Sequence, residues 1–256
     1  MLTALRQSDS VKVIARECER DAAPFQGPEC RREVTLRKGN IKAHHFAHKP
    51  PVTCSRGKGE SEQHLQIKLA IFDALGRESN VADLEIERDF GVSVADVYAR
   101  ISGTPVAIEI QRSTLSANEI NARTRNYHQL GIYVLWIALP EPALTTSKYS
   151  PSAWEKWCHT TYFGRVYYWE QGQVLKVVHF DPYVIEVPHS IWYEHGSEQS
   201  AGGYDRRSKR WRKPRFGVPA LISTSFRSSN RQAWAGGTVV VPECSIYVDR
   251  QAKWWA

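Results

Sequence analysis

The sequence predicts an α/β fold in which helices flank a central mixed β-sheet. Two observations carry this prediction. Residues 57–140 follow the pattern helix, strand, strand, strand, helix, strand, and 42% of the 256 residues are hydrophobic, which is enough for a sizeable core. Residues 141–256 add short β-like runs rich in Trp and Tyr. We therefore divide the chain into residues 1–56, 57–140 and 141–256.

The first part of the chain combines β-like runs with potential metal ligands. "VKVIARE" and "REVTLRK" read as short strands, and His and Cys residues cluster just after them in "AHHFAHKPPVTC". The whole chain has five cysteines, an odd and scattered set that does not predict a disulfide framework. We therefore expect a reducing, cytoplasmic location, because no stretch reads as a secretory signal or a membrane span.

The middle part begins with a predicted helix. "SEQHLQIKLAIFDAL", which starts at Ser61, contains good helix formers and no Gly or Pro before Gly76. Glu60, His64 and Lys68 are spaced by four residues, so they would share one face of this helix. A strand over residues 83–90 follows.

Two further strand-like runs predict a tight hairpin. "VADVYARI" and "TPVAIEIQ" are separated by Ser102-Gly103, and Gly tolerates the positive φ that a two-residue loop needs. With this loop, Asp96 lies directly opposite Glu109, and Gln111 shares their face because side chains alternate along a strand. Facing carboxylates, with Cβ atoms about 4.5–5.5 Å apart, repel each other unless a shared cation separates them. A four-residue loop would keep the three side chains on one face, whereas a one-residue slip would separate them.

A second helix and a buried strand complete the middle part. "SANEINARTRNYHQLG" has a capping-box pattern, Ser116 followed by Glu119, and Gly131 is a natural helix stop. Arg123 and Tyr127 are four residues apart and would lie on one face of this helix. "IYVLWIAL" then reads as a buried strand.

The last part of the chain holds a concentrated block of positive charge. The whole chain has a formal net charge of +7, and "DRRSKRWRKPR" contains seven basic residues and one acidic residue. Trp211 within the block could stack on bases while the cations bind a phosphate backbone, and the alternative is a solvated, partly disordered loop. The candidate nucleic-acid-binding residues are Arg206, Arg207, Lys209, Arg210, Arg212, Lys213 and Arg215.

The same region predicts a β-rich structure. Gln171-Gly172 and Asp181-Pro182 are turn patterns that would separate its strands. Its tryptophans would either fill the core or form an interface with a protein partner or a second copy of the chain. These tryptophans are Trp154, Trp157, Trp169 and Trp192.

Five segments in order resemble the competence protein CoiA family. They are "CRREVTLRKGNIKAHHFAHKP", "GESEQHLQIKLAIF", "ADVY", "AIEIQRSTLS" and "ARTRNYHQLGIYVLWI", which together span roughly residues 25–140. The resemblance is to the nuclease-like domain of that family, of the PD-(D/E)XK type. It implies a restriction-endonuclease-like core with a small N-terminal zinc-finger-like module. It further implies a nuclease that processes DNA in uptake, recombination or defence against foreign DNA.

The resemblance assigns roles to the polar residues of the hairpin. Asp96 and Glu109 would hold Mg²⁺ or Mn²⁺, and Gln111 stands where such folds commonly have a Lys. Glu60 or Glu62, at the start of the preceding helix, would supply a supporting carboxylate.

The missing Lys leaves two functions open. Gln111 cannot act as a cation or a general base, so His64 or Lys68 would have to supply the charge. Arg123 and Tyr127 resemble the polar pair that contacts DNA or orients the site. If turnover has been lost, the chain would be a non-catalytic DNA-binding accessory protein that retains the nuclease fold.

The resemblance also implies a zinc site in the N-terminal part. The family typically carries a Cys-Pro-x-Cys pair before "HFAH", but Gly27 stands here where the first Cys is expected. A structural zinc ion prefers four ligands, so Cys30, His48 and Cys54 would need either His45 or Cys18 to complete the site. The candidate ligands are Cys30, His45, His48 and Cys54. The alternative is a site that no longer binds zinc, with Cys30 as a buried thiol.

Overall fold

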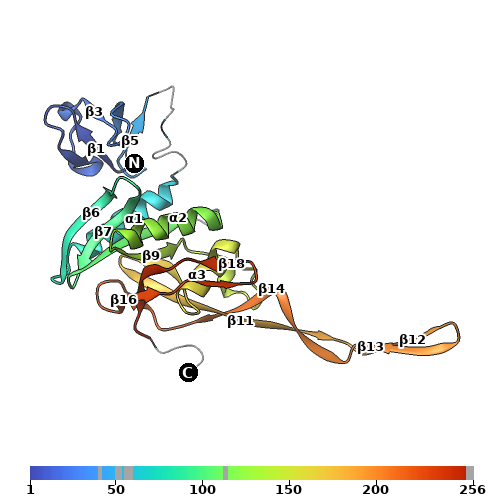
Figure 1. Cartoon of the computed structure of the whole chain (residues 1–256). Coiled ribbons are helices and arrows are strands. Elements are labelled where there is room, and N and C mark those ends of the chain that lie inside the picture. Colours follow the sequence, from blue (N-terminus) through green and yellow to red (C-terminus); the bar gives the residue numbers. More distant parts are fainter. Residues whose placement is uncertain (40–41, 50–53, 55–59, 112–114, 252–256) are drawn as a thin grey trace.

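The computed structural model describes residues 1–39, 42–49, 54, 60–111 and 115–251 of the chain. Figure 1 shows an N-terminal module, a central sheet with helices packed on it and a long hairpin that projects away from the sheet. Within the described residues, no helix has the length and apolar character needed to cross a membrane.

The N-terminal module is a small antiparallel sheet with its own core. Its strands pair in the order β2-β1-β3-β4-β5, and two 3₁₀ turns, η1 (Ala15–Glu17) and η2 (Arg20–Ala22), follow β2. Buried residues such as Phe25 and Phe46, whose rings are 5.0 Å apart, form the core. The strands are β1 (Thr3–Arg6), β2 (Lys12–Ile14), β3 (Phe25–Gln26), β4 (Glu33–Arg37) and β5 (His45–His48).

The central sheet follows the predicted order of elements through residue 138. The antiparallel strands β6, β7 and β8 are followed by β9, which pairs in parallel with β8 after the α2 crossover. The mixed α/β architecture is therefore confirmed. The elements are α1 (Glu62–Leu75), β6 (Val81–Asp89), β7 (Val94–Ile101), β8 (Thr104–Gln111), α2 (Ala117–Gln129) and β9 (Tyr133–Ala138).

The predicted hairpin register is confirmed. Ile101 pairs with Thr104 and the ladder continues to Val97 opposite Ile108. Ser102 and Gly103 have φ values of 48° and 78°, the left-handed conformations that such a loop requires. The register therefore brings Asp96 and Glu109 to adjacent places just beyond the last of these pairs.

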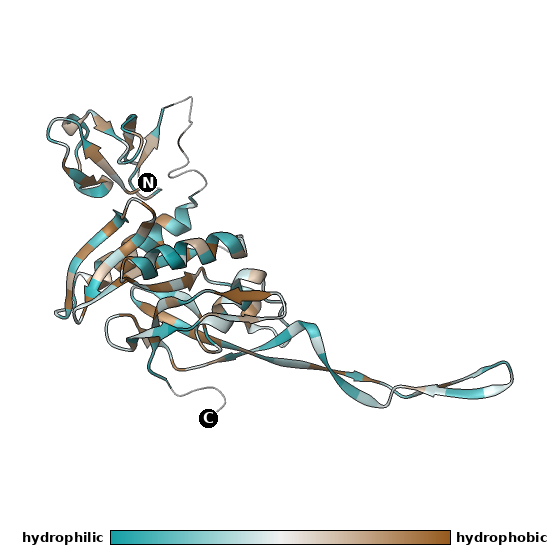
Figure 2. Cartoon of the chain, in the orientation of Figure 1, coloured by the Kyte–Doolittle hydropathy of each residue, from teal (hydrophilic) through white to brown (hydrophobic). Residues whose placement is uncertain are grey.

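The predicted helix ends are also confirmed. The Ser61 side chain accepts a hydrogen bond from His64 N, and α1 ends at Gly76. Ser116 and Glu119 form the expected capping box of α2, which satisfies backbone donors at the helix start. Figure 2 shows that α2 presents hydrophilic residues on its outer side.

The sheet continues across residue 140 into the C-terminal region. β10 pairs in parallel with β9, and β19 joins β9 through Ile246 opposite Val134. The remaining elements here are η3 (Pro142–Thr145), α3 (Ala153–Thr161), β10 (Val166–Gln171), β15 (Ala220–Leu221), β16 (Phe226–Arg231), β17 (Trp234–Gly236), β18 (Val239–Val241) and β19 (Cys244–Asp249).

The tryptophans of this region divide between core and surface. Trp154 and Trp157 are buried, and Trp169 is half-buried against the same core. Trp192, by contrast, is 44% exposed. The core-filling interpretation therefore holds for the first three.

A long hairpin extends from the sheet as an arm, which we define as residues 180–216 (Figure 1). The expected strand break at Asp181-Pro182 is wrong, because β11 passes through both residues and pairs Pro182 with Arg212. The register shifts just after Pro182, where residues 208–211 of β14 form a bulge opposite Tyr183. The irregularity therefore lies in β14, and β11 runs on without a turn. The arm contains most of β11 (Val174–Val187), β12 (Ser190–Glu194), β13 (Ser197–Ala201) and β14 (Tyr204–Phe216).

Candidate functional site

Polar side chains from α1, α2, β6 and β7 converge on a cavity of about 550 Å³ beside the central sheet. Helix α1 supplies Lys68 from its second turn, and β6 and β7 supply the carboxylates Glu87 and Asp96. The charged residues that line the cavity are Glu29, Glu60, Lys68, Glu87, Asp96, Glu119 and Arg123.

Lys68 lies at the centre of this group and is only 2% exposed. Its Nζ is 3.0 Å from Asp96 Oδ1 and 3.1 Å from Glu87 Oε1, and it also donates to Glu60 Oε1. A buried ammonium is stable only when opposite charges surround it. Burial lowers the pKa of Lys68, but the three carboxylates outweigh it and hold that pKa well above the usual value.

Asp96 is ionised and fixed in place by several donors. Its Oδ2 accepts hydrogen bonds from Ile110 N at 2.9 Å and from the His64 imidazole, whose Nε2 is 3.1 Å away. Burial alone would raise the pKa of this carboxyl, but Lys68 and His64 lower it well below the usual value. Asp96 is therefore an available anionic ligand at neutral pH.

Glu60, His64 and Asp96 form a group whose donor atoms all lie within 4.8 Å of one another. Two carboxylates and an imidazole suit Mn²⁺, whereas Mg²⁺ prefers oxygen ligands alone. The residues present therefore fit a divalent ion. Sequence reasoning assigned the ion to Asp96 and Glu109, but the structure brings Asp96 together with Glu60 and His64.

Glu109 has different partners, which come from α2. Its Oε2 is 2.5 Å from an Arg123 nitrogen, and its Oε1 accepts a hydrogen bond of 2.5 Å from the Tyr127 hydroxyl. Burial and the nearby charge of Asp96 raise the pKa of Glu109 to about 7, although Arg123 opposes that shift. The expected Arg123–Tyr127 pair thus lies on one helix face and holds the carboxylate.

Gln111 and Glu62 lie at the edges of the site. Gln111 is half-buried at the end of β8, on the face it shares with Glu109. Glu62 turns away to the N-terminal module, where its Oε1 accepts a hydrogen bond of 2.6 Å from Ala43 N. Of the two supporting carboxylates considered from the sequence, Glu60 is the one beside Asp96.

Glu87 is a member of the site that sequence reasoning missed. It lies in β6 with a φ of 50°, and it is 4% exposed. Beyond Lys68, it accepts hydrogen bonds from Leu2 N and from the backbone and hydroxyl of Thr3. Burial raises the pKa of Glu87, but Lys68 outweighs it and the pKa falls to about 2. This carboxylate therefore links the N-terminal module to the cavity.

A second group of potential metal ligands lies in the N-terminal module. Cys30, His48 and Cys54 place their donor atoms within 4.8 Å of one another, and Cys30 Sγ is 4.0 Å from His48 Nε2. A Cβ atom at Gly27 would lie 2.8 Å from Cys30 Sγ and 3.0 Å from a His48 ring carbon. The three side chains therefore fit zinc as a partial set, with the fourth ligand position at Gly27.

Two of the other residues considered as zinc ligands lie elsewhere. His45 is three residues before His48 in β5, so its side chain leaves the opposite face of the strand, where Nδ1 contacts Ala43 O at 2.9 Å. Cys18 is buried in the core of the module, and burial raises the pKa of its thiol.

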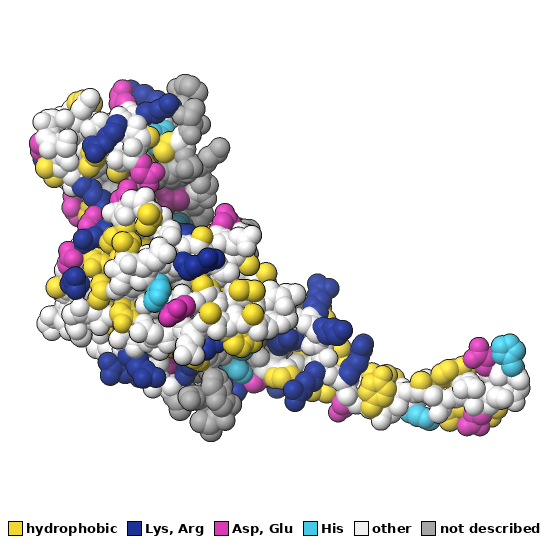
Figure 3. All heavy atoms as spheres, viewed as in Figure 1, with side chains coloured by type: hydrophobic (Ala, Val, Ile, Leu, Met, Phe, Trp, Pro, Cys, Tyr) yellow, Lys and Arg dark blue, Asp and Glu magenta, His cyan; other side chains and the backbone are white. Residues whose placement is uncertain are grey.

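The basic block lies on the arm and not in a loop. Its residues belong to β14, and they are exposed or half-buried apart from Ser208. Figure 3 shows Lys and Arg side chains gathered along the half of the arm nearest the sheet, whereas the tip carries acidic, His and hydrophobic side chains. Trp211 is covered by two cations, since Lys148 Nζ and the Arg210 guanidinium lie 4.7 and 4.6 Å from its ring.

Comparison with known proteins finds two family models that match the chain. The model of the competence protein CoiA nuclease-like domain matches residues 60–179, and that of the CoiA N-terminal domain matches residues 9–56. Competence protein CoiA of Bacillus subtilis (strain 168) is 32% identical over 114 residues, which are 44% of this chain and 31% of that protein. The alignment thus spans about a third of the curated relative, and no solved structure matches. The arm lies outside both matched ranges.

Proposed function

This chain belongs to the CoiA family, and on that premise we propose that it is a divalent-metal-dependent nuclease that hydrolyses DNA phosphodiester bonds. The observation that carries the proposal is the convergence of Glu60, His64 and Asp96 beside the buried Lys68. The core would then be that of a PD-(D/E)XK nuclease, as the sequence implies.

The chemistry requires an activated water and a neutralised phosphate. An Mg²⁺ or Mn²⁺ ion held by Glu60, His64 and Asp96 would polarise the phosphate and lower the pKa of a bound water. Lys68 holds Glu60 and Asp96 together against their mutual repulsion, and it supplies the positive charge that Gln111 lacks. Gln111 itself offers an amide that can orient water or a phosphate oxygen.

Arg123 is the cation placed to bind the scissile phosphate. It lines the cavity, and its pKa is raised because Glu109 and Asp96 outweigh the effect of its burial. Glu109 and the stacked Trp136 ring, 5.2 Å from the guanidinium, fix its orientation. In this arrangement Tyr127 acts through Glu109 as a positioning residue.

The arm would contact the DNA outside the cavity. A two-stranded ribbon fits the major groove of a duplex, and exposed Arg and Lys side chains neutralise phosphates. The basic residues of β14, apart from the half-buried Arg212, are exposed on such a ribbon. The reaction would serve DNA processing in uptake, recombination or defence.

One observation favours a second function, a DNA-binding accessory protein without turnover. Lys68 already contacts both Glu60 and Asp96. An ammonium in that position competes with a divalent ion for the same oxygens. In that case the chain would bind DNA and not cut it.

Cleavage assays distinguish the two functions. We expect labelled single- or double-stranded DNA to be cut with Mn²⁺ or Mg²⁺ and left intact with EDTA. Asp96→Ala should lose about 10³-fold or more in rate, and Glu109→Ala should also be impaired. Asp83→Asn is a matched control, because Asp83 is an exposed carboxylate on the neighbouring strand. Cleavage that survives both site substitutions would reject this site, and binding without cleavage in the wild type would favour the accessory function.

A further inference from the structure

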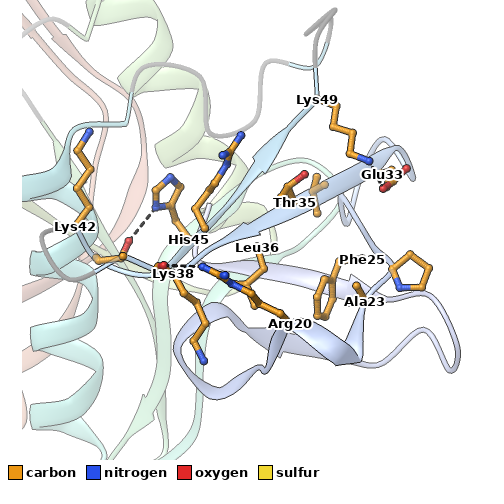
Figure 4. Close-up of a pocket in the computed structure, with 15 residues that line it drawn as sticks. Arg20, Ala23, Phe25, Glu33, Thr35, Leu36, Lys38, Lys42, His45 and Lys49 are labelled. Atoms are coloured by element: carbon orange, nitrogen blue, oxygen red, sulfur yellow. Dashed lines mark hydrogen bonds and ion pairs between the residues drawn. The ribbon is translucent and has the colours of Figure 1, made fainter.

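We propose that the N-terminal module binds single-stranded nucleic acid in a groove separate from the Glu60–His64–Asp96 group. This proposal deepens the proposed nuclease function and rests on it. The groove has a volume of about 890 Å³ and lies against β3 and β4, on the side of the module where His45 projects (Figure 4). A volume of this size suits a short stretch of an extended ligand.

The residues around the groove carry a net positive charge, which favours an anionic ligand. Five cations border it and a single carboxylate, Glu33, opposes them. Phosphate backbones bind such clusters through many weak, salt-sensitive contacts. The cations are Arg20, Arg37, Lys38, Lys42 and Lys49.

Two of these cations are available to a ligand. Arg37 and Lys42 are exposed, and neither has a side-chain hydrogen bond or ion pair to another described residue. Lys38, in contrast, donates to Cys18 O at 2.6 Å and to Glu19, and Lys49 pairs with Glu33. A bound phosphate chain would supply the opposite charge that Arg37 and Lys42 lack among the described residues.

The inner surface of the groove favours bases that are not paired. Ala23 and Pro24 are exposed apolar residues of its lining, whereas Phe25 and Leu36 lie buried beneath, so apolar carbon lies between the bordering cations. In a duplex the base faces are stacked inside and cannot reach such a surface, whereas a single strand exposes them. The combination of cations at the border and apolar carbon inside therefore fits a single strand better than a duplex.

The groove also connects to the candidate nuclease site. Ala43, one of its lining residues, donates its backbone N–H to Glu62 Oε1 in the first turn of α1. His64 follows two residues later and contacts Asp96. A strand held in the groove would thus be anchored on the segment that carries the site.

Binding measured without metal tests the groove independently of cleavage. The probe is a fluorescent 12-nucleotide oligothymidylate, titrated in EDTA at several salt concentrations with the complete chain. We expect Arg37→Gln/Lys42→Gln to weaken binding by about tenfold and to reduce the salt slope by about 1.4, the value for two lost single-strand phosphate contacts. The matched control is Arg77→Gln/Arg227→Gln, which removes the same charge from exposed residues elsewhere whose side chains have no hydrogen bond or ion pair to another described residue. It should change binding less than twofold.

Three results of the titration would contradict single-strand binding in the groove. The first is an unchanged affinity, the second is an equal loss in the control, and the third is an equal loss for a duplex of the same length. Cross-linking of an iodouracil-substituted strand supplies a second measurement, and we expect adducts within residues 20–49. Adducts confined to the arm would also reject the groove as the binding site.

If Asp96→Ala abolishes cleavage while the groove variant binds normally, the proposed nuclease function stands and only the groove proposal fails. If the wild type never cleaves DNA but binds the oligonucleotide through the groove, the groove proposal stands and the proposed nuclease function fails.

Discussion

Lys68→Met is expected to lower the free energy of unfolding by about 3–5 kcal/mol, the range for removing one partner of a buried ion pair. The substitution keeps most of the side-chain volume but removes the ammonium that Glu60, Glu87 and Asp96 share, and leaves the Met1 α-ammonium, 2.9 Å from Glu60 Oε2, to offset part of their repulsion. Chemical denaturation in EDTA measures the loss.

A divalent ion should restore part of this stability. With the ammonium gone, Mn²⁺ can bind the same carboxylates, so the melting temperature of Lys68→Met should rise with Mn²⁺ more than that of the wild type. Lys176→Met is the control, because Lys176 forms only an exposed pair with Glu170. A loss below about 1 kcal/mol, or no response to Mn²⁺, would show that these carboxylates do not form one electrostatic group.

Gly27→Cys is expected to create a tight zinc site. A Cβ atom at position 27 would lie only 2.8 Å from Cys30 Sγ and 3.0 Å from a His48 ring carbon, so these side chains must move slightly, after which a thiolate there would complete four ligands with Cys54. We expect zinc affinity to rise roughly 100-fold over the wild type, equivalent to about 2.7 kcal/mol. Competition with a chromophoric chelator measures the affinity, and elemental analysis should give one zinc per chain.

The control adds a cysteine elsewhere in the same module. A Cβ atom at Gly39 would have no neighbour within 4 Å, so Gly39→Cys gains a thiol without completing a site. Its zinc affinity should match that of the wild type. Equal affinities for the two variants would show that Cys30, His48 and Cys54 do not share an ion.

Local rules explain what could be predicted from the sequence. The alternation of strand side chains and the two-residue loop set the register that makes Asp96 and Glu109 neighbours. Ser116 and Glu119 revealed the start of α2 because capping depends on residues within one turn, and the run of helix formers from Ser61 to Gly76 revealed α1. The helical repeat places His64 and Lys68 on one face of α1, whereas Glu60 lies before the N-cap Ser61 and therefore outside that repeat.

Long-range packing explains what could not be predicted. Glu87 joins the site only because β1 and α1 both approach β6, and its contacts with Thr3 span 84 residues. No local pattern indicates which strand edge a distant segment will meet. The same limit applies to Glu109, since its role as a partner of Arg123 depends on how α2 packs on the sheet. At Pro182 the chain continues as a strand and does not turn, because the bulge in the neighbouring strand β14 accommodates the irregular pairing.

The most direct test of the metal centre is the electron spin echo modulation of Mn²⁺ bound to the wild type and to His64→Gln. We expect nitrogen modulation from a histidine ligand in the wild type and its loss in His64→Gln, because the His64 imidazole lies within 4.8 Å of the Glu60 and Asp96 carboxylates. Modulation that persists in His64→Gln, or none in the wild type, would contradict a centre formed by Glu60, His64 and Asp96.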